Sequence, residues 1–401
     1  MEEMIQQQTI KEAAASLAEE VRDIRRQIHC HPELSFQEIE TARLVHEKLT
    51  EWGIEHQTGV AGTGVVAHIK GNNPDSCCIA LRADMDALPI EETESCPYRS
   101  EVNGVMHACG HDAHTAMLLG VAKILNTLKD SFEGSVRLIF QPGEEKLPGG
   151  AKAMIESGVL ENVDAIFAQH CYPDLPCGSI GVCSGSYMAS SNEINISIKG
   201  KGGHAAKPEH TQDMVWIAAK TLTELQFKVR NFMTQKTPYL LRFGQFMANG
   251  TYNVVPDEIT IKGTFRTYDE QMRHAAIIFM ESLVKEEAHY FGVNAEVKID
   301  EGYPFLYNDK MLKKHVKQEA VDYLGQGKVV ELEPLFTSED FAWYSHQVPA
   351  FFYRLGTSNK AKGIVGKQHT STYDIDEDCL ETGMGLMAWI AVSQLASKHE
   401  E

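Results

Sequence analysis

Alternating strands and helices predict an α/β protein of two domains, in which a layered α/β domain is interrupted by a smaller α+β insertion domain. The chain has 401 residues, more than one ordinary hydrophobic core organises. Strand-like runs alternate with helical segments at both ends of the chain, whereas strands with one polar face begin near residue 188 and end near residue 303. We therefore expect a main domain formed by residues 1–187 and 303–401, and an insertion domain formed by residues 188–302.

The first segment begins with a helix. Leu17, Val21, Ile24 and Ile28 lie on one helical face within residues 10–28, and Pro32 ends this pattern. Short apolar runs bounded by turn residues then predict buried strands, and a periodic stretch predicts a second helix between them. These strands are expected at 64–69, 77–82, 136–140 and 165–168, and the helix at 112–128.

The middle segment has a different pattern. Ile194, Ile196 and Ile198 alternate with polar residues, which predicts a strand with one exposed face. A similar strand around residues 259–265 and helices over 211–232 and 270–291 complete a small open-sheet domain. After residue 303, a helix at 309–323 and a strand at 350–355 return to the α/β pattern.

Composition excludes several classes of function. The net charge of −19, without a local cluster of Lys and Arg, argues against nucleic-acid binding. No apolar run reaches the roughly 18 residues of a membrane span, and the acidic N-terminal stretch lacks the apolar core of a signal peptide. The nine cysteines do not form a disulfide framework. We expect a cytoplasmic protein without a membrane or nucleic-acid partner.

Residues 107–114 (HACGHDAH) form the densest group of candidate metal ligands. Cys and His side chains bind zinc and similar ions, and Gly110 permits a sharp backbone turn between two of them. Asp112 is placed to cap the helix that follows. The same residues could hold a structural zinc ion in a binding protein, or Cys109 could be a nucleophile with His107 or His111 as its base.

Carboxylates follow two of the predicted strands. Glu144 and Glu145 lie just after the strand at 136–140, so that one can bind a metal while the other faces a reacting water. Asp84 and Asp86 end the strand at 77–82, where they could orient a ligand histidine or pair with Arg82. With His170 and His369, these residues predict a two-metal hydrolase.

The motifs resemble those of the aminoacylase/carboxypeptidase-type amidohydrolases, a family that includes bacterial N-acyl-amino-acid amidohydrolases, hippurate hydrolases and plant auxin-conjugate hydrolases. The resemblance extends from about residue 20 to about residue 390. It rests on residues 25–35 (RRQIHCHPELS), 82–89 (RADMDALP), 107–114 (HACGHDAH), 141–145 (QPGEE), 200–206 (GKGGHAA), 253–257 (NVVPD) and 338–341 (SEDF). Gly143 stands where the family more often has alanine, a difference that we do not expect to affect the chemistry.

The resemblance implies roles for residues of the main domain. This becomes a di-metal catalytic domain with Glu144 as general base and Asp86 as the acidic residue that orients the site. A bridging hydroxide between the two divalent metals would attack the amide carbonyl. Zinc or manganese is expected, with cobalt and nickel as further candidates. The implied metal ligands are Cys109, His111, Glu145, His170 and His369.

For the insertion domain, the resemblance implies a lid that also forms a homodimer, with a tetramer as the alternative. His204 would reach the partner subunit's active site and stabilise the oxyanion. Asn253 and Arg266 are weaker candidates for binding the substrate's carboxylate, and Arg266 could equally form a cross-strand ion pair.

The activity expected from the resemblance is hydrolysis of the amide bond of N-acyl or N-aroyl amino acids. A small-peptide carboxypeptidase or dipeptidase, or an N-acetyl-diaminopimelate-type deacetylase, could use the same site. The expected partner is thus a small N-acyl amino acid or a short peptide.

Overall fold

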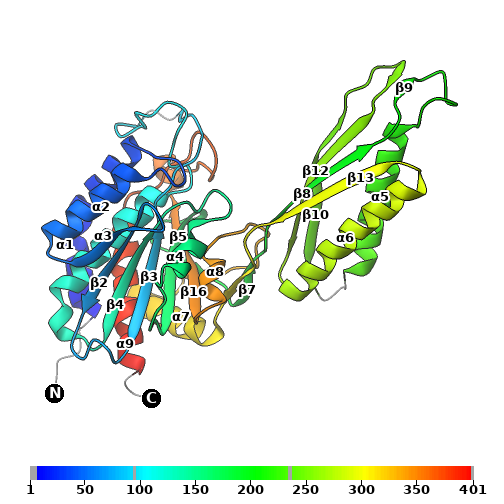
Figure 1. Cartoon of the computed structure of the whole chain (residues 1–401). Coiled ribbons are helices and arrows are strands. Elements are labelled where there is room, and N and C mark those ends of the chain that lie inside the picture. Colours follow the sequence, from blue (N-terminus) through cyan, green and yellow to red (C-terminus); the bar gives the residue numbers. More distant parts are fainter. Residues whose placement is uncertain (1–6, 94–95, 234–236, 399–401) are drawn as a thin grey trace. The chain divides into compact units, whose positions relative to one another are not determined.

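A computed structural model of the chain describes residues 7–93, 96–233 and 237–398. These residues divide into two compact units (Figure 1). The first unit comprises the chain up to Gly185, Tyr307–Glu333 and the chain from Asp340 onward. The second comprises Ser186–Leu306 and the short segment Pro334–Glu339. The sequence pattern gave no sign that this short segment belongs with the second unit.

An eight-stranded mixed sheet forms the centre of the first unit, with the strand order β1-β2-β4-β3-β5-β16-β6-β15. β3, β4, β5 and β16 are parallel neighbours, and their residues are almost entirely buried, as is typical of strands covered on both faces. The strands are β1 (Glu55–Val60), β2 (Gly64–Lys70), β3 (Cys78–Asp84), β4 (Ser135–Gln141), β5 (Ala165–Pro176), β6 (Ile180–Val182), β15 (Val329–Glu331) and β16 (Ala350–Ser358).

Helices cover both faces of this sheet. In Figure 1, α9 (Cys379–Lys398) lies behind the sheet, whereas α4 (Gly150–Glu156) and α8 (Ala342–Ser345) lie in front of it. α9 packs against the other long helices of its layer, which are α1 (Gln7–Cys30), α3 (His111–Thr127) and α7 (Lys310–Leu324). α2 (Ile39–Glu51) packs beside β1 and β2, and η1 (Lys129–Ser131) and η2 (Lys360–Lys362) are single turns.

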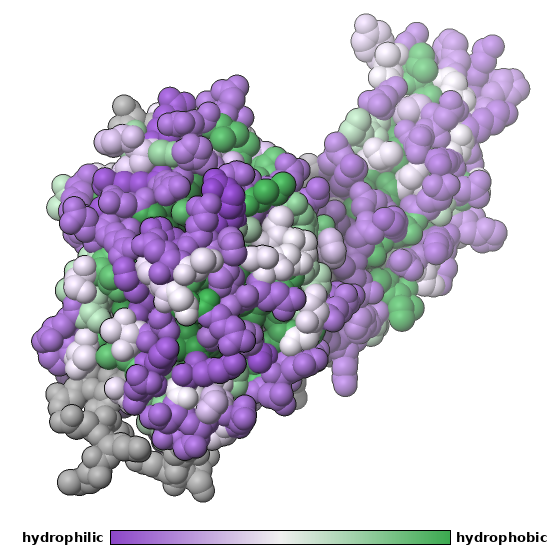
Figure 2. All heavy atoms as spheres, turned by 60° about the vertical axis from the view of Figure 1, so that its left-hand side comes forward, coloured by the Kyte–Doolittle hydropathy of each residue, from purple (hydrophilic) through white to green (hydrophobic). Residues whose placement is uncertain are grey.

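α9 is long and apolar enough to cross a bilayer by length and composition, but 72% of its apolar stretch is buried inside the protein. Its residues belong to the same core cluster as those of α1 and α3. Burial among other helices explains why this helix is apolar all round. On the face seen in Figure 2, hydrophilic side chains cover most of the surface, with smaller apolar patches between them.

The second unit is an antiparallel four-stranded sheet with two helices on one face. The strand order is β10-β12-β8-β13, and α5 (Met214–Phe232) and α6 (Glu270–Tyr290) pack on the buried face of the sheet. The strands are β8 (Asn192–Lys199), β10 (Tyr239–Ala248), β12 (Glu258–Thr267) and β13 (Asn294–Glu301). One short pair accompanies them, β9 (Gly203–His204) with β11 (Val254–Val255). A second short pair, β7 (Gly185–Met188) with β14 (Leu306–Asn308), is formed where the chain passes from one unit to the other.

The predicted α/β fold class is confirmed, as are the helices and strands expected along the chain. Ile194, Ile196 and Ile198 are buried and alternate with more exposed residues, as predicted for a one-sided sheet. Several elements were not expected, among them the strands β1, β6, β10, β13 and β15 and the helix α2. β1, β6 and β15 are short or largely exposed, so that their apolar periodicity is weak. α2 has a buried apolar face formed by Leu44, Val45 and Leu49, which was not recognised.

Candidate metal centre

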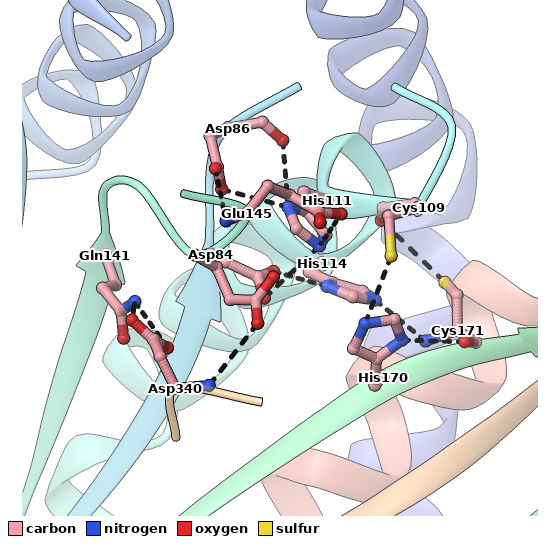
Figure 3. Close-up of polar contacts among 12 residues, drawn as sticks. Asp84, Asp86, Cys109, His111, His114, Gln141, Glu145, His170, Cys171 and Asp340 are labelled. Carbon is pink, nitrogen blue, oxygen red and sulfur yellow. Dashed lines mark hydrogen bonds and ion pairs between the residues drawn. The ribbon is translucent and has the colours of Figure 1, made fainter. Parts of the chain in front are cut away.

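The candidate metal centre of the first unit lies at the carboxyl ends of parallel strands. β3 ends at Asp84, and His170 lies within β5 (Figure 3). β4 ends at Gln141, shortly before Glu144 and Glu145. The carboxyl ends of parallel strands meet at one edge of a sheet, which is where α/β enzymes hold their ligands. The start of α3, which carries His111, meets the same edge.

A left-handed turn presents the start of α3 to the site. Gly110 precedes the helix with φ of +96°, and a Cβ there would lie 2.7 Å from the Tyr373 hydroxyl and 2.9 Å from Cβ of Cys171. Only glycine meets both demands without strain. The expectation that Asp112 caps α3 is wrong. Its carboxylate instead accepts hydrogen bonds from Arg25 Nε at 2.7 Å and His29 Nδ1 at 2.8 Å.

His111 directs one ring nitrogen to a carboxylate and the other into the centre. Nδ1 lies 2.9 Å from the Asp86 carbonyl oxygen and 3.2 Å from Asp86 Oδ1. Nε2 is buried and has no hydrogen-bond partner among the described residues. It lies 3.6 Å from Asp84 Oδ2 and 3.9 Å from Glu145 Oε1. Burial lowers the pKa of His111, but the carboxylates of Asp84, Asp86 and Glu145 outweigh it and raise the pKa to about 10.

His170 and His114 lie side by side but differ in their free atoms. His170 donates from Nδ1 to the Cys171 carbonyl at 2.8 Å, so that Nε2 is left as an acceptor. Both nitrogens of His114 are engaged, because Nδ1 donates to Asp84 Oδ1 at 2.6 Å and Nε2 accepts from the Cys171 N–H at 2.8 Å. Burial lowers the pKa of both rings. His170 can therefore ligate a cation, whereas His114 supports Asp84.

The Cys109 thiol faces this group of side chains. Its Sγ lies 3.5 Å from His170 Nε2, and the ligand atoms of Cys109, His111 and Glu145 lie within 4.8 Å of one another. Burial, followed by the nearby carboxylates of Glu145 and Glu144, holds the pKa of Cys109 well above its usual value. A thiolate at this position therefore needs a cation close to it.

The two glutamates after β4 have different surroundings. Glu145 Oε1 lies 3.1 Å from His369 Nε2, and that oxygen accepts no hydrogen bond from a described residue. Glu144 is 6% exposed, and its Oε1 accepts a 3.4 Å hydrogen bond from the Asp340 N–H. His369 has a φ of +60°, a strained conformation for a non-glycine residue that is often found at functional sites. Its backbone N–H is fixed by the Ala108 carbonyl at 2.8 Å.

The sequence left open whether Asp84 and Asp86 orient a ligand histidine or pair with Arg82, and each residue takes one of these roles. Asp86 supports His111, and its Oδ2 also accepts hydrogen bonds from the Ser35 hydroxyl at 2.6 Å and the Glu145 N–H at 2.9 Å. Asp84 forms the ion pair with Arg82 at 2.7 Å. Ser35 lies in the motif at residues 25–35, but nothing in the sequence indicated that it contacts Asp86.

A buried network that the sequence did not reveal lies behind Glu144. Arg82 Nη2 donates to Asp340 Oδ1 at 2.8 Å, and Gln141 Nε2 donates to both oxygens of Asp340. Burial raises the pKa of Asp340 to about 6, although Arg82 acts in the opposite direction. The network holds the Asp340 backbone, whose N–H contacts Glu144.

The donor set fits divalent cations. Two buried atoms that point inward, His111 Nε2 and Glu145 Oε1, have no hydrogen-bond partner among the described residues, which is costly unless a ligand satisfies them. His111 and His170 each hold Nδ1 on an oxygen and direct Nε2 into the centre, as metal-ligating histidines do. Thiolate, imidazole and carboxylate donors together suit zinc and neighbouring metals.

In the second unit, the sheet brings two predicted residues together and separates the third. His204 pairs with Val254 across the β9–β11 ladder, and the Ala205 N–H donates to the carbonyl of Asn253 at 3.0 Å. Arg266 lies at the other end of β12, eight residues beyond Glu258, which corresponds to about 27 Å of strand. Its Nη1 donates to the Phe336 carbonyl at 2.9 Å and to Ser338 Oγ at 3.3 Å. We find no ion pair between Arg266 and any described carboxylate.

Comparison with known proteins identifies a matching family and several relatives of this chain. The family model described as "Peptidase family M20/M25/M40" matches residues 80–392. An Arabidopsis thaliana protein named IAA-amino acid hydrolase ILR1-like 4 is 40% identical over 377 residues, which cover 93% of this chain and 85% of that protein. A Bacillus subtilis protein named N-acetylcysteine deacetylase is 39% identical over 371 residues, which cover 92% of this chain and 95% of that protein.

A solved structure extends the likeness to three dimensions. The Bacillus subtilis YXEP protein, described as a dinuclear metal binding peptidase from the M20 family, is 36% identical to this chain, with a TM-score of 0.82. The match covers 95% of this chain and 99% of that protein.

Proposed function

Because the chain belongs to peptidase family M20/M25/M40 and is therefore a metal-dependent amidohydrolase or peptidase, we propose that it hydrolyses the amide bond of N-acyl or N-aroyl amino acids. The resemblance inferred from the sequence motifs is confirmed at the level of the family. The observation that carries the proposal is the buried cluster of Cys109, His111 and Glu145, which lies beside His170 Nε2 and next to Glu144.

The proposed metal ligands are Cys109, His111, Glu145, His170 and His369, and the proposed cofactor is a pair of divalent ions, zinc or manganese in the first instance. When bound, such ions polarise the amide carbonyl and acidify the attacking water. His111 Nε2 and Glu145 Oε1, which accept no hydrogen bond from the part of the chain that the structure describes, support the place of both residues in this set. Asp86 fixes the ring of His111 and the backbone of Glu145, so we assign it the orienting role.

In the proposed reaction, Glu144 takes a proton from the attacking water and returns it to the leaving amine. Its restraint by the Asp340 N–H supports this assignment, because a general base must be held within hydrogen-bond reach of the proton that it moves. Cleavage then gives a carboxylate and a free amino acid.

We further propose that the chain acts as a homodimer in which the partner supplies His204 and Asn253, and that Arg266 is a further substrate-binding residue. Arg266 lies about 27 Å along β12 from the strand end near His204 and Asn253, so one copy of this sheet cannot bring all three around one small substrate. His204 would stabilise the oxyanion, and Asn253 and Arg266 would bind the substrate's carboxylate.

The proposed location is the cytoplasm. All nine cysteines are free, which fits a reducing compartment.

The two rival interpretations of the cysteine–histidine loop are weaker. A nucleophilic cysteine needs a lowered pKa, whereas burial and carboxylates raise the pKa of Cys109. A structural zinc site is closed by four ligands of the Cys and His type, whereas here carboxylates join the thiol and imidazole groups around His111 Nε2, which has no hydrogen-bond partner among the described residues.

Metal content and activity measured on one preparation test the proposal. Hydrolysis of N-acetyl, N-benzoyl and dipeptide substrates would be followed before chelation, after chelation and after addition of zinc or manganese. We expect about two metals per chain, loss and recovery of activity together, and faster cleavage of N-acyl amino acids than of dipeptides. Activity that persists without metal would overturn the proposal, and preferred cleavage of dipeptides would favour the peptidase alternative.

A further inference from the structure

Phe36 is an aromatic residue in a strained backbone conformation, and it lies beside the loop that carries Glu144 and Glu145. The proposed reaction gives it no role. Phe36 has a φ of +65°, a conformation that costs a bulky residue free energy and marks candidate functional positions. Its side chain is 39% exposed, although the neighbouring Ser35 and Glu38 are buried. A large apolar side chain is thus held at the surface in an unfavourable backbone conformation.

Buried polar contacts on both sides hold Phe36 in place. The carboxylate of Glu38, which is fully buried, accepts hydrogen bonds from the Phe36 N–H and the Gly143 N–H, both at 2.8 Å. Its second oxygen accepts the Thr63 hydroxyl at 2.6 Å. On the other side, Ser35 donates to Asp86. Glu38 and Asp86 therefore fix Phe36 to the two segments that carry the proposed catalytic groups.

The ring of Phe36 packs directly on Gly143. A Cβ added to Gly143 would lie 2.5 Å from Cε1 and Cζ of this ring, and Gly143 itself has a φ of +62°. Gly143 precedes the proposed base Glu144, and consecutive Cα atoms are about 3.8 Å apart. The ring therefore lies against the loop that carries the proposed base, where the acyl substituent of a bound substrate could contact its exposed part.

We propose that Phe36 forms one wall of an acyl-group subsite, which favours aromatic or bulky apolar acyl groups over acetyl. Aromatic rings prefer offset or edge-to-face contact with another ring and bury a large apolar area when they meet. Because buried hydrogen bonds already hold this wall in place, little conformational entropy is lost when the acyl group binds. This inference rests on the proposed function, because it assigns the acyl group of that substrate class.

The test compares kcat/KM for N-benzoyl-alanine and N-acetyl-alanine in the full-length metal-loaded enzyme. Phe36→Gly removes the ring and the backbone strain together, and Phe36→Asn removes the ring but retains a residue that tolerates positive φ. For both variants we expect the ratio of benzoyl to acetyl kcat/KM to fall about tenfold or more, since lost apolar contact changes discrimination by this order. The loss of kcat/KM should be smaller for the acetyl substrate than for the benzoyl substrate, because acetyl offers the ring less apolar surface.

Ile39→Ala is the matched control, because Ile39 is another exposed apolar side chain of the same segment, 65% exposed. Its ratio should be unchanged. Equal losses for both substrates in the Phe36 variants would assign Phe36 a structural role only, and no change in either would exclude contact with the acyl group. Both results would overturn the inference. If the parent enzyme cleaves neither substrate, the proposed function fails first, and this result is distinct from an unchanged ratio.

Discussion

The carboxylate of Asp86 binds the backbone N–H of Glu145 at 2.9 Å through the same oxygen that accepts the Ser35 hydroxyl. Its other oxygen lies 3.2 Å from His111 Nδ1. One side chain thus aligns two proposed metal ligands that belong to segments 34 residues apart. Such supporting contacts commonly determine how tightly a metal is held.

We predict that Asp86→Asn weakens metal binding by about 10- to 100-fold, because the amide cannot accept from His111, Ser35 and Glu145 together. Competition with a chromophoric chelator measures this affinity. Ser35→Ala removes only one of the three donors and should have a smaller effect. Metal affinity within twofold of the parent enzyme in Asp86→Asn would exclude the orienting role.

We expect substitutions of Glu144 and Glu145 to have different effects on metal content and on kcat. Glu144→Gln is expected to retain both metals but to lower kcat by about 100- to 10,000-fold, because a general base is lost. Glu145→Gln should instead lose metal, since a charged ligand is replaced by a neutral one. Metal content and kcat measured on the two purified variants give the comparison. Near-normal turnover of Glu144→Gln would rule out Glu144 as the base.

Gly143→Ala should impair the enzyme, although the sequence suggested that this position is chemically neutral. An alanine with a φ near +62° costs about 1–2 kcal/mol, and its Cβ would also collide with the Phe36 ring. We expect a lower unfolding midpoint and a lower kcat. Adding Phe36→Gly removes the collision but not the backbone cost, so the double variant should recover only part of the loss. Unchanged stability in Gly143→Ala would refute the argument.

Much of the fold could be predicted from the sequence, because long periodic segments decide the main helices and strands. The apolar face of α1 was visible in its spacing, and so was the strict alternation in β8. Short exposed strands such as β1 were missed, since their burial pattern has no alternation to detect.

Side-chain partners were harder to predict than element positions. The sequence placed Asp84 and Asp86 together but could not decide which pairs with Arg82, because both follow the same strand. Asp112 was expected at a helix cap, yet Arg25, 87 residues earlier in the chain, holds its carboxylate. Such pairings depend on how distant segments meet, which local patterns do not encode.

The buried histidine His29 should make stability depend on pH. Burial lowers its pKa, but Asp112 at 2.8 Å and Glu92 at 3.4 Å outweigh this and raise the pKa above its usual value. A raised pKa in the folded state contributes stability that is fully present below the unfolded pKa of about 6.5 and is lost as the pH rises through the folded pKa. His29→Gln should therefore destabilise the protein by about 3 kcal/mol at pH 6 and by less at pH 9.

Urea unfolding of the parent enzyme and His29→Gln at both pH values measures the difference. His31→Gln is the matched control, because His31 is exposed and should give a small difference at either pH. A gap between the parent enzyme and His29→Gln that widens from pH 6 to pH 9 would contradict the charged state assigned to His29.

Mixing two inactive variants can decide whether His204 acts across a dimer. His204→Ala should keep fold and metal but lose most activity, because an oxyanion donor is typically worth about 100- to 1,000-fold in kcat. Glu144→Gln is inactive for a different reason. If the partner supplies His204, a mixed dimer contains one site with both an intact Glu144 and an intact His204. At equal amounts with free exchange, half of the dimers are mixed, and about a quarter of the parent activity should return.

Two controls make this result specific. Subunit exchange must be verified with tagged chains, since variants that never exchange cannot complement each other. Glu144→Gln mixed with Glu145→Gln should give no recovery, because both defects lie in the first unit and each site of the mixed dimer keeps one of them. Recovery only in the mixture that contains His204→Ala would establish that His204 serves the partner's site. Verified exchange without recovery would show instead that each chain uses its own His204.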